Sequence, residues 1–247
     1  MTRGTKILLV AAVLATTLIS AFANGQLGLV GEAGALTKQK TGYTDEFFLG
    51  DCDFSSKGSN RFFILEPDYQ LRLRGEGKDG TKIQLTITVL DRTKEVDGVQ
   101  TRIVEEKETE DGEVVEVSKN YFAICKQTNS VFYFGESVDI YEGGKVVSHE
   151  GSWLAGEDQA KAGLIMAGVV LLGAKYQQET APGVAMDRAE IVSMDEEVET
   201  PAGNFKGVLN VRETTPLGPG LVDYKYYAAG IGLIQDGNLK LEQHGFV

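Results

Sequence analysis

The amino-acid sequence predicts a mainly β protein, a curved antiparallel sheet (a half-barrel or open barrel) built from successive hairpins. Three observations predict it. Residues 81–90 alternate apolar and polar side chains with a two-residue period. Asp-Gly and Gly-Gly pairs recur between apolar segments. The segment after the leader has no clear helical period; its best helix candidate, 157–175, carries three glycines that disfavour a long helix.

Tight turns and short strands account for the chain from residue 81 onward. Hairpin turns are expected at Asp97-Gly98, Asp111-Gly112 and Gly143-Gly144, because these pairs readily adopt the positive φ of two-residue loops. In the second half, further strands are predicted at 189–194, 205–213, 222–228, 231–235 and 239–244.

The segment 75–80 has the letters of the nucleotide-binding motif G-x-G-x-x-G. That motif needs a helix after it, since the phosphates rest on the helix N-terminus. The alternating segment 81–90 follows instead, so we interpret 75–80 as a hairpin turn.

An internal similarity links the two halves, at about 90–135 and 190–235. Each half contains a turn, an apolar strand and a Tyr-aromatic-Ala triplet, at 121–123 and at 226–228. This pattern predicts a weak duplication of one β unit; chance similarity between two β-meanders is the alternative.

The first residues have the pattern of a secretory signal peptide. Arg3 and Lys6 precede an apolar segment, 7–19, and Ala21-Phe22-Ala23 supplies a small-x-small cleavage pattern. A membrane anchor is the alternative, but Thr16, Thr17 and Ser20 interrupt the apolar run. We therefore expect a signal peptide at 1–23, a flexible lead at 24–50 and a single β-rich domain at 51–247, exported to the periplasm, cell surface or medium without a transmembrane segment.

Export changes the interpretation of Cys52 and Cys125, the two cysteines of the chain. Outside the cytoplasm an even pair is more often a disulfide than a reactive site. The alternative is two thiols too far apart to be bridged.

Charge and histidine content exclude several functions. The chain has 24 basic and 36 acidic residues, a net charge of −12, which argues against nucleic-acid binding. Its two histidines, His149 and His244, have no spacing typical of metal ligands. We predict no metal and no cofactor.

Aromatic and apolar side chains are the candidates for ligand binding. Neighbouring residues of a strand point to opposite faces, so Tyr224 and Tyr226 share a face and Tyr227 takes the other. If one sheet face is open, such rings line an apolar groove; the alternative is core packing. The apolar run 164–172 is either a core-facing loop or strand, or a mobile surface patch. The candidate ligand-binding residues are Tyr133, Trp153, Met166, Tyr224 and Tyr226.

From about residue 60 onward the sequence resembles a widespread family of uncharacterised bacterial secreted proteins. The resemblance rests on segments that keep their order: 62–67, 97–102, 132–136, Glu150-Gly151-Ser152-Trp153, 181–183, 200–203 and 226–232. It implies an exported β-rich domain whose curved sheet is like that of periplasmic lipoprotein carriers, and it implies no reaction. The two cysteines and the strongly apolar 164–172 segment depart from the family pattern.

These observations favour an exported, non-enzymatic binding module for a lipid or other apolar small molecule on a concave sheet face. A module that binds an envelope protein, or has a structural role in the envelope, is the alternative. The third hypothesis is a hydrolase. Its catalytic site would consist of carboxylates that the sequence does not single out, because the sequence contains no serine or cysteine nucleophile motif.

Overall fold

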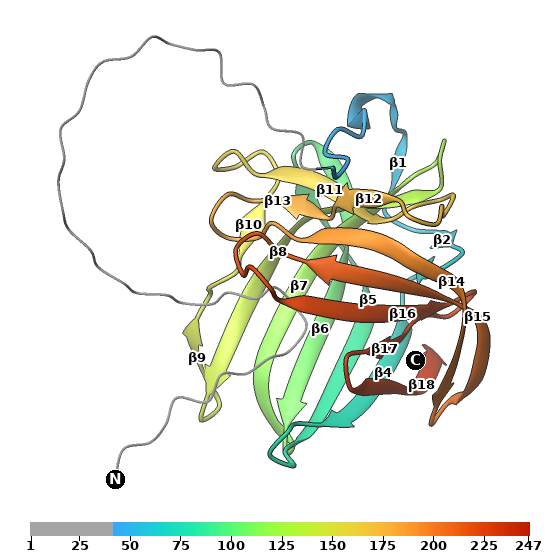
Figure 1. The fold of residues 1–247 in the computed structure, drawn as a ribbon. Coiled ribbons are helices and arrows are strands. Elements are labelled where there is room, and N and C mark those ends of the chain that lie inside the picture. Colours follow the sequence, from blue (N-terminus) through green and yellow to red (C-terminus); the bar gives the residue numbers. More distant parts are fainter. Residues whose placement is uncertain (1–41) are drawn as a thin grey trace, which may run out of the picture.

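A computed structural model describes residues 42–247 of the chain. This part consists of strands and one 3-10 turn, η1 (Leu49–Asp51), with no α-helix (Figure 1). The mainly β prediction is therefore confirmed. The predicted signal peptide, 1–23, and residues 24–41 of the predicted lead lie outside the described residues.

The long strands fall into two groups, β5–β8 and β14–β15. In chain order the strands are β1 (Phe54–Ser55), β2 (Ser59–Asn60), β3 (Phe63–Ile64), β4 (Tyr69–Glu76), β5 (Lys82–Val96), β6 (Val99–Glu110), β7 (Glu113–Cys125), β8 (Ser130–Glu142), β9 (Lys145–Ser148), β10 (Trp153–Leu154), β11 (Lys161–Met166), β12 (Lys175–Gln177), β13 (Glu179–Thr180), β14 (Arg188–Thr200), β15 (Gly203–Thr214), β16 (Val222–Ala228), β17 (Gly232–Asp236) and β18 (Leu239–Phe246).

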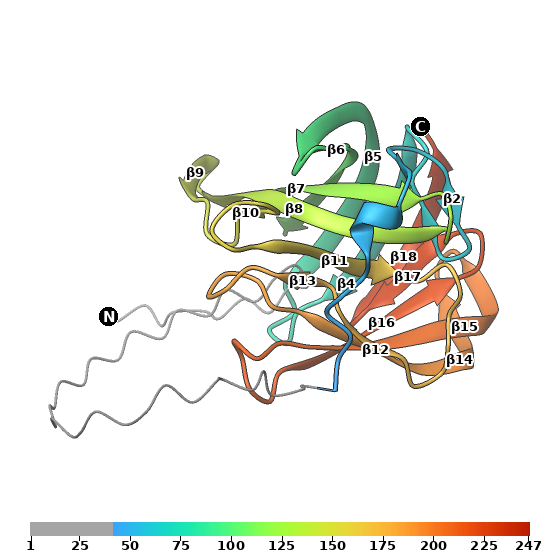
Figure 2. The ribbon, with the colours of Figure 1, turned by 90° about the horizontal axis from the view of Figure 1, so that it is seen from above.

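One antiparallel sheet contains nearly all of these strands, in the order β12-β14-β15-β16-β17-β18-β4-β5-β6-β7-β8-β11-β13. Strand β18 returns to pair with β4, from Lys240 opposite Arg74 to Phe246 opposite Tyr69. The view from above separates the wall of β7 and β8 from that of β15 and β16 (Figure 2). The predicted curved sheet is therefore present, and it continues around into a nearly closed barrel.

The two ends of the sheet meet at residues 175–180. Strand β12 pairs with β14, β13 pairs with β11, and Gln178 alone separates β12 from β13. Gly163 of β11 allows this approach: a Cβ atom there would lie 2.5 Å from the carbonyl carbon of Gln178. Only glycine lets two backbones come this close.

The hairpin turns lie where the sequence predicts them. Asp97 and Gly98, with φ of 49° and 74°, connect β5 to β6, as expected for a two-residue turn with positive φ at both positions. The segment 75–80 contains the end of β4 and the turn into β5, so it is a hairpin and not a nucleotide-binding loop.

The weak helix candidate at 157–175 is wrong. Residues 161–166 form β11, which pairs with β8 on one side and β13 on the other. Pairing with other strands prevails here, and two of the three glycines lie where the backbone meets another segment, Gly163 at Gln178 and Gly168 at Thr128. The apolar run 164–172 is divided: Met166 is buried, whereas Val169, Leu171 and Leu172 are exposed.

Residues 47–54 pack against β7 and β8. Phe54 packs edge-on against Phe132 and Phe134 of β8, with ring centroids 6.0 and 5.3 Å apart. The segment is fixed covalently, because Cys52 and Cys125 form a disulfide with Cα atoms 5.1 Å apart. The end of the lead is thus docked, although Phe48 itself is exposed.

Candidate functional site

A short hairpin, residues 58–65, packs against the barrel; we call it the cap. The Leu65 amide donates to the Gly58 carbonyl at 2.9 Å and closes the hairpin. The Asn60 side-chain amide donates to the carbonyl oxygens of Asn129 and Ala167, at 2.7 and 3.0 Å. The cap is therefore tied to the β7–β8 turn and to the loop after β11.

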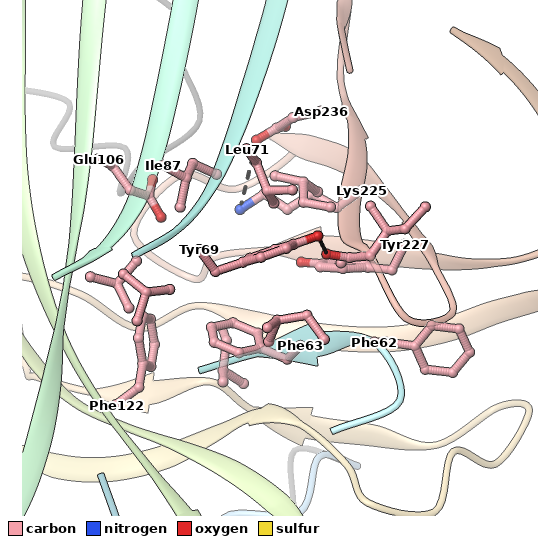
Figure 3. Close-up of a pocket in the computed structure, with 17 residues that line it drawn as sticks. Phe62, Phe63, Tyr69, Leu71, Ile87, Glu106, Phe122, Lys225, Tyr227 and Asp236 are labelled. Atoms are coloured by element: carbon pink, nitrogen blue, oxygen red, sulfur yellow. Dashed lines mark hydrogen bonds and ion pairs between the residues drawn. The ribbon is translucent and has the colours of Figure 1, made fainter. Parts of the chain in front are cut away.

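A cavity of about 90 Å³ lies between the cap and the barrel interior (Figure 3). Its walls are mostly apolar. The Phe63 ring of the cap meets the Phe122 ring of β7 edge-on, with centroids 5.1 Å apart. The Tyr69 hydroxyl donates to the Ile231 carbonyl at 3.0 Å, so this polar atom already has a partner. Other apolar lining residues include Phe62, Leu71, Ile87, Val104 and Tyr227. We call this cavity the cap pocket.

Three charged side chains, Glu106, Lys225 and Asp236, line the cap pocket beside these apolar walls. Lys225 Nζ lies 2.9 Å from a carboxylate oxygen of Glu213 and 4.0 Å from one of Asp236. Burial alone would lower the pKa of Lys225, but these two carboxylates hold it well above its ordinary value. Burial raises the pKa of Asp236 to about 7, against the lowering effect of Lys225. The pocket thus combines an apolar wall with a protonated lysine.

Further carboxyl groups inside the barrel, beyond those that line the cap pocket, interact with one another. Burial, reinforced by neighbouring carboxylates, raises the pKa of Glu108 and Glu136 to about 8, and that of Glu116 to about 7. The pKa of Glu106 is raised in the same way. Several of these groups therefore hold a proton at neutral pH, which limits the charge inside the barrel.

The predicted ligand-binding residues are dispersed. Tyr133 is buried, stacks on Phe122 and donates from its hydroxyl to Asn120 Oδ1 at 2.6 Å. Met166 is buried outside the cap-pocket lining. Trp153 lines a second cavity. Tyr224 is exposed and Tyr226 is partly buried, and neither lines the cap pocket.

Two of the lining residues that the prediction omitted lie on β16 and point to the face opposite that of the predicted tyrosines. Lys225 and Tyr227 alternate with Tyr224 and Tyr226 on β16, and they line the cap pocket. A signal for them exists in the sequence. Phe122 and Tyr227 are the middle residues of the two Tyr-aromatic-Ala triplets, and both contribute to the lining.

Neither a metal centre nor a membrane-spanning helix is found in residues 42–247. No three His, Cys, Asp or Glu side chains of this part are arranged to hold a metal ion. His149 is largely exposed, with its Nδ1 atom 2.9 Å from Asp139. No helix within the same range has the length and apolar character needed to cross a bilayer.

No protein-family model matches the chain, and no curated protein matches its sequence significantly. Among solved structures, the chain aligns with a Bacteroides fragilis protein described as a candidate exported protein with a YmcC-like fold. The alignment covers 76% of this chain and 100% of that one, at 16% identity and a TM-score of 0.35. A likeness this distant supports no argument about function.

Proposed function

We propose that the protein is an exported, non-enzymatic binding module that takes an apolar ligand with a small polar group into the cap pocket. The observation that carries this proposal is the pocket itself, with apolar walls and a few charged groups. Ligand sites in proteins commonly combine an apolar surface with a few polar groups that orient the ligand. Export is supported by the signal-like N-terminus and by the disulfide, since disulfides persist in oxidising compartments.

The size of the cap pocket indicates how a ligand enters. Its volume of about 90 Å³ is smaller than the roughly 150 Å³ that admits benzene in an engineered core. A larger ligand therefore requires the cap to move outward. This movement breaks the hydrogen bonds from Asn60 and to Arg61, and it exposes Phe62 and Leu65, which are buried, so contacts with the ligand have to compensate for the loss.

The proposal is tested by filling the pocket. Ile87 lines it from β5, so Ile87→Trp occupies its volume, and Val146→Trp on the exposed face of β9 is the matched control. The probe is N-phenyl-1-naphthylamine, an apolar dye that fluoresces when it leaves water. We expect saturable uptake by the wild type and by Val146→Trp, and at least a tenfold loss of affinity in Ile87→Trp. No saturable uptake by the wild type, or equal uptake by all three, would contradict the proposal.

One observation favours a second candidate function, hydrolysis. Glu106 and Asp236, both carboxyl groups with a raised pKa, line the same pocket, as an acid–base pair would. Structural ion pairs perturb pKa values too, and Asp236 already lies near Lys225. A screen of ester, glycoside and phosphoester substrates decides: turnover that Asp236→Asn abolishes supports a hydrolase, and no turnover supports the binding module.

A further inference from the structure

We propose that the ligand of the cap pocket is an apolar amine whose ammonium group lies against Glu106. This inference rests on the proposed function and names the class of ligand. Glu106 of β6 lines the cavity together with Lys225 of β16 and Asp236 of β17. Figure 3 shows these three charged side chains on one side of the pocket and the rings of Phe63 and Phe122 on the other.

Glu106 is the charged group of the lining that has no direct partner. Its carboxyl group forms no hydrogen bond and no ion pair with any residue in 42–247. The side chain keeps some accessible surface, and it lines the cavity. Burial raises the pKa of Glu106 even though Lys225 opposes this shift. The carboxylate therefore lacks a counter-ion close enough to compensate for its burial.

Lys225 is not free to serve a ligand. Its Nζ atom lies 2.9 Å from one carboxylate oxygen of Glu213 and 4.0 Å from one of Asp236. The other oxygen of Glu213 accepts a hydrogen bond from the side-chain amide of Gln178 at 2.7 Å, so Glu213 is fully engaged. The positive charge of the pocket is thus matched by the neighbouring strands, and Glu106 is left over.

This balance of charge selects the sign of the ligand. An anionic head group would meet Glu106 and Asp236 and would have to compete with Glu213 for Lys225. Removing a partner from a buried charge pair is costly. An ammonium group instead supplies Glu106 with its counter-ion and a charge-assisted hydrogen bond. The pocket therefore favours a cationic head group over a carboxylate of the same chain length.

Tyr227 supplies an independent indication that a polar atom enters the pocket. Its side chain is 7% exposed and lines the cavity, yet its hydroxyl forms no hydrogen bond with any other residue in the described part of the chain. The Tyr69 hydroxyl, in the same wall, donates to the Ile231 carbonyl. Buried hydroxyl groups are nearly always paired, so the unpaired one points to a bound molecule that supplies its partner.

The apolar part of the amine has its own surface. The rings of Phe62, Phe63 and Phe122 and the side chains of Leu71 and Ile87 form the rest of the wall. Aromatic rings pack against a hydrocarbon chain and also attract a cation close to their faces. An amine with an alkyl tail thus matches both parts of the lining.

Displacement of N-phenyl-1-naphthylamine from the full mature chain tests the inference. Octylamine, octanol and octanoate have the same chain length and differ in the head group, and each is titrated below the concentration at which it forms micelles. We expect octylamine to displace the dye at a concentration at least tenfold lower than octanol or octanoate. Equal displacement by octanol or octanoate would overturn the inference and leave the proposed function intact, whereas no dye uptake by the wild type would contradict both.

Two variants assign the effect to Glu106. Glu106→Gln should weaken octylamine tenfold or more, while octanol and the dye stay within twofold, which also shows that the variant folds. Glu105→Gln makes the same change at the neighbouring position of β6, which points to the opposite face and does not line the pocket, and it should leave all three affinities within twofold. Equal loss of octylamine affinity in both variants, or in neither, would overturn the inference. The comparison of head groups on the wild type does not depend on either variant.

Discussion

Protons held inside the barrel should make the protein less stable as the pH rises from 5.5 to 7.5. Glu136 is the clearest case, since burial raises its pKa to about 8 from an ordinary value of 4.5. Below pH 4.5 this carboxyl is protonated in both the folded and the unfolded chain and has no effect. Between 4.5 and 8 only the folded chain holds the proton, so the free energy of unfolding falls with pH, by about 1.4 kcal/mol per pH unit for one proton.

The size of the effect can be calculated from that slope. Between pH 5.5 and 7.5 the Glu136 proton alone should lower the free energy of unfolding by about 2.5 kcal/mol. Glu108 and Asp236, whose pKa values burial raises to about 8 and about 7, act with the same sign. Urea unfolding at pH 5.5, 6.5 and 7.5 measures the effect. Most proteins are at their most stable between about pH 5 and 8, so a steep fall in this range is distinctive.

The variant Glu136→Gln isolates one of these protons. Glutamine resembles the protonated acid and cannot ionise, so the slope of unfolding free energy against pH should decrease by about one proton relative to the wild type. Glu142→Gln, at an exposed position near the end of β8, should leave the slope unchanged. Parallel curves for Glu136→Gln and the wild type, or a wild-type stability that rises across this range, would show that Glu136 does not hold a proton in the folded chain.

The disulfide, the Phe122 ring and Gly163 should each contribute measurably to the stability of the fold. Replacing Cys52 and Cys125 with serine opens a connection of 73 residues and should lower the unfolding free energy by roughly 4 kcal/mol in the chain-entropy model, measured by urea denaturation. Phe122→Ala should cost roughly 3 kcal/mol and lower the melting temperature, because a large buried ring is lost beside an existing cavity. Gly163→Ala should destabilise by roughly 1–3 kcal/mol, because its Cβ would clash with Gln178. Gly50→Ala, with no atom near its Cβ position, should stay within about 0.5 kcal/mol.

Local rules predicted most of the strands and turns. The two-residue alternation at 81–90 falls within β5 from residue 82 onward, and Asp97-Gly98 is the turn that follows this strand. Such signals depend on neighbours in the chain, so one sequence is enough to detect them. Closure of the barrel depends on segments distant in sequence: nothing near β4 indicates that its partner is β18.

The candidate site was harder to predict, for a related reason. Alternation on β16 separates Tyr224 and Tyr226 from Lys225 and Tyr227, but it does not say which set faces the interior. Hydrophobicity favours the tyrosines, yet the interior contains a lysine balanced by Glu213 and Asp236. That compensation comes from other strands, β15 and β17, and it becomes visible only when the strands are placed side by side.

An apolar ligand held in the cap pocket should remain bound during purification, and native mass spectrometry of the mature protein purified from its own host detects it by its mass. We expect a bound small molecule on the wild type and on Val146→Trp, and its loss from Ile87→Trp. A bare polypeptide mass for the wild type, together with no uptake of the naphthylamine dye, would contradict this expectation.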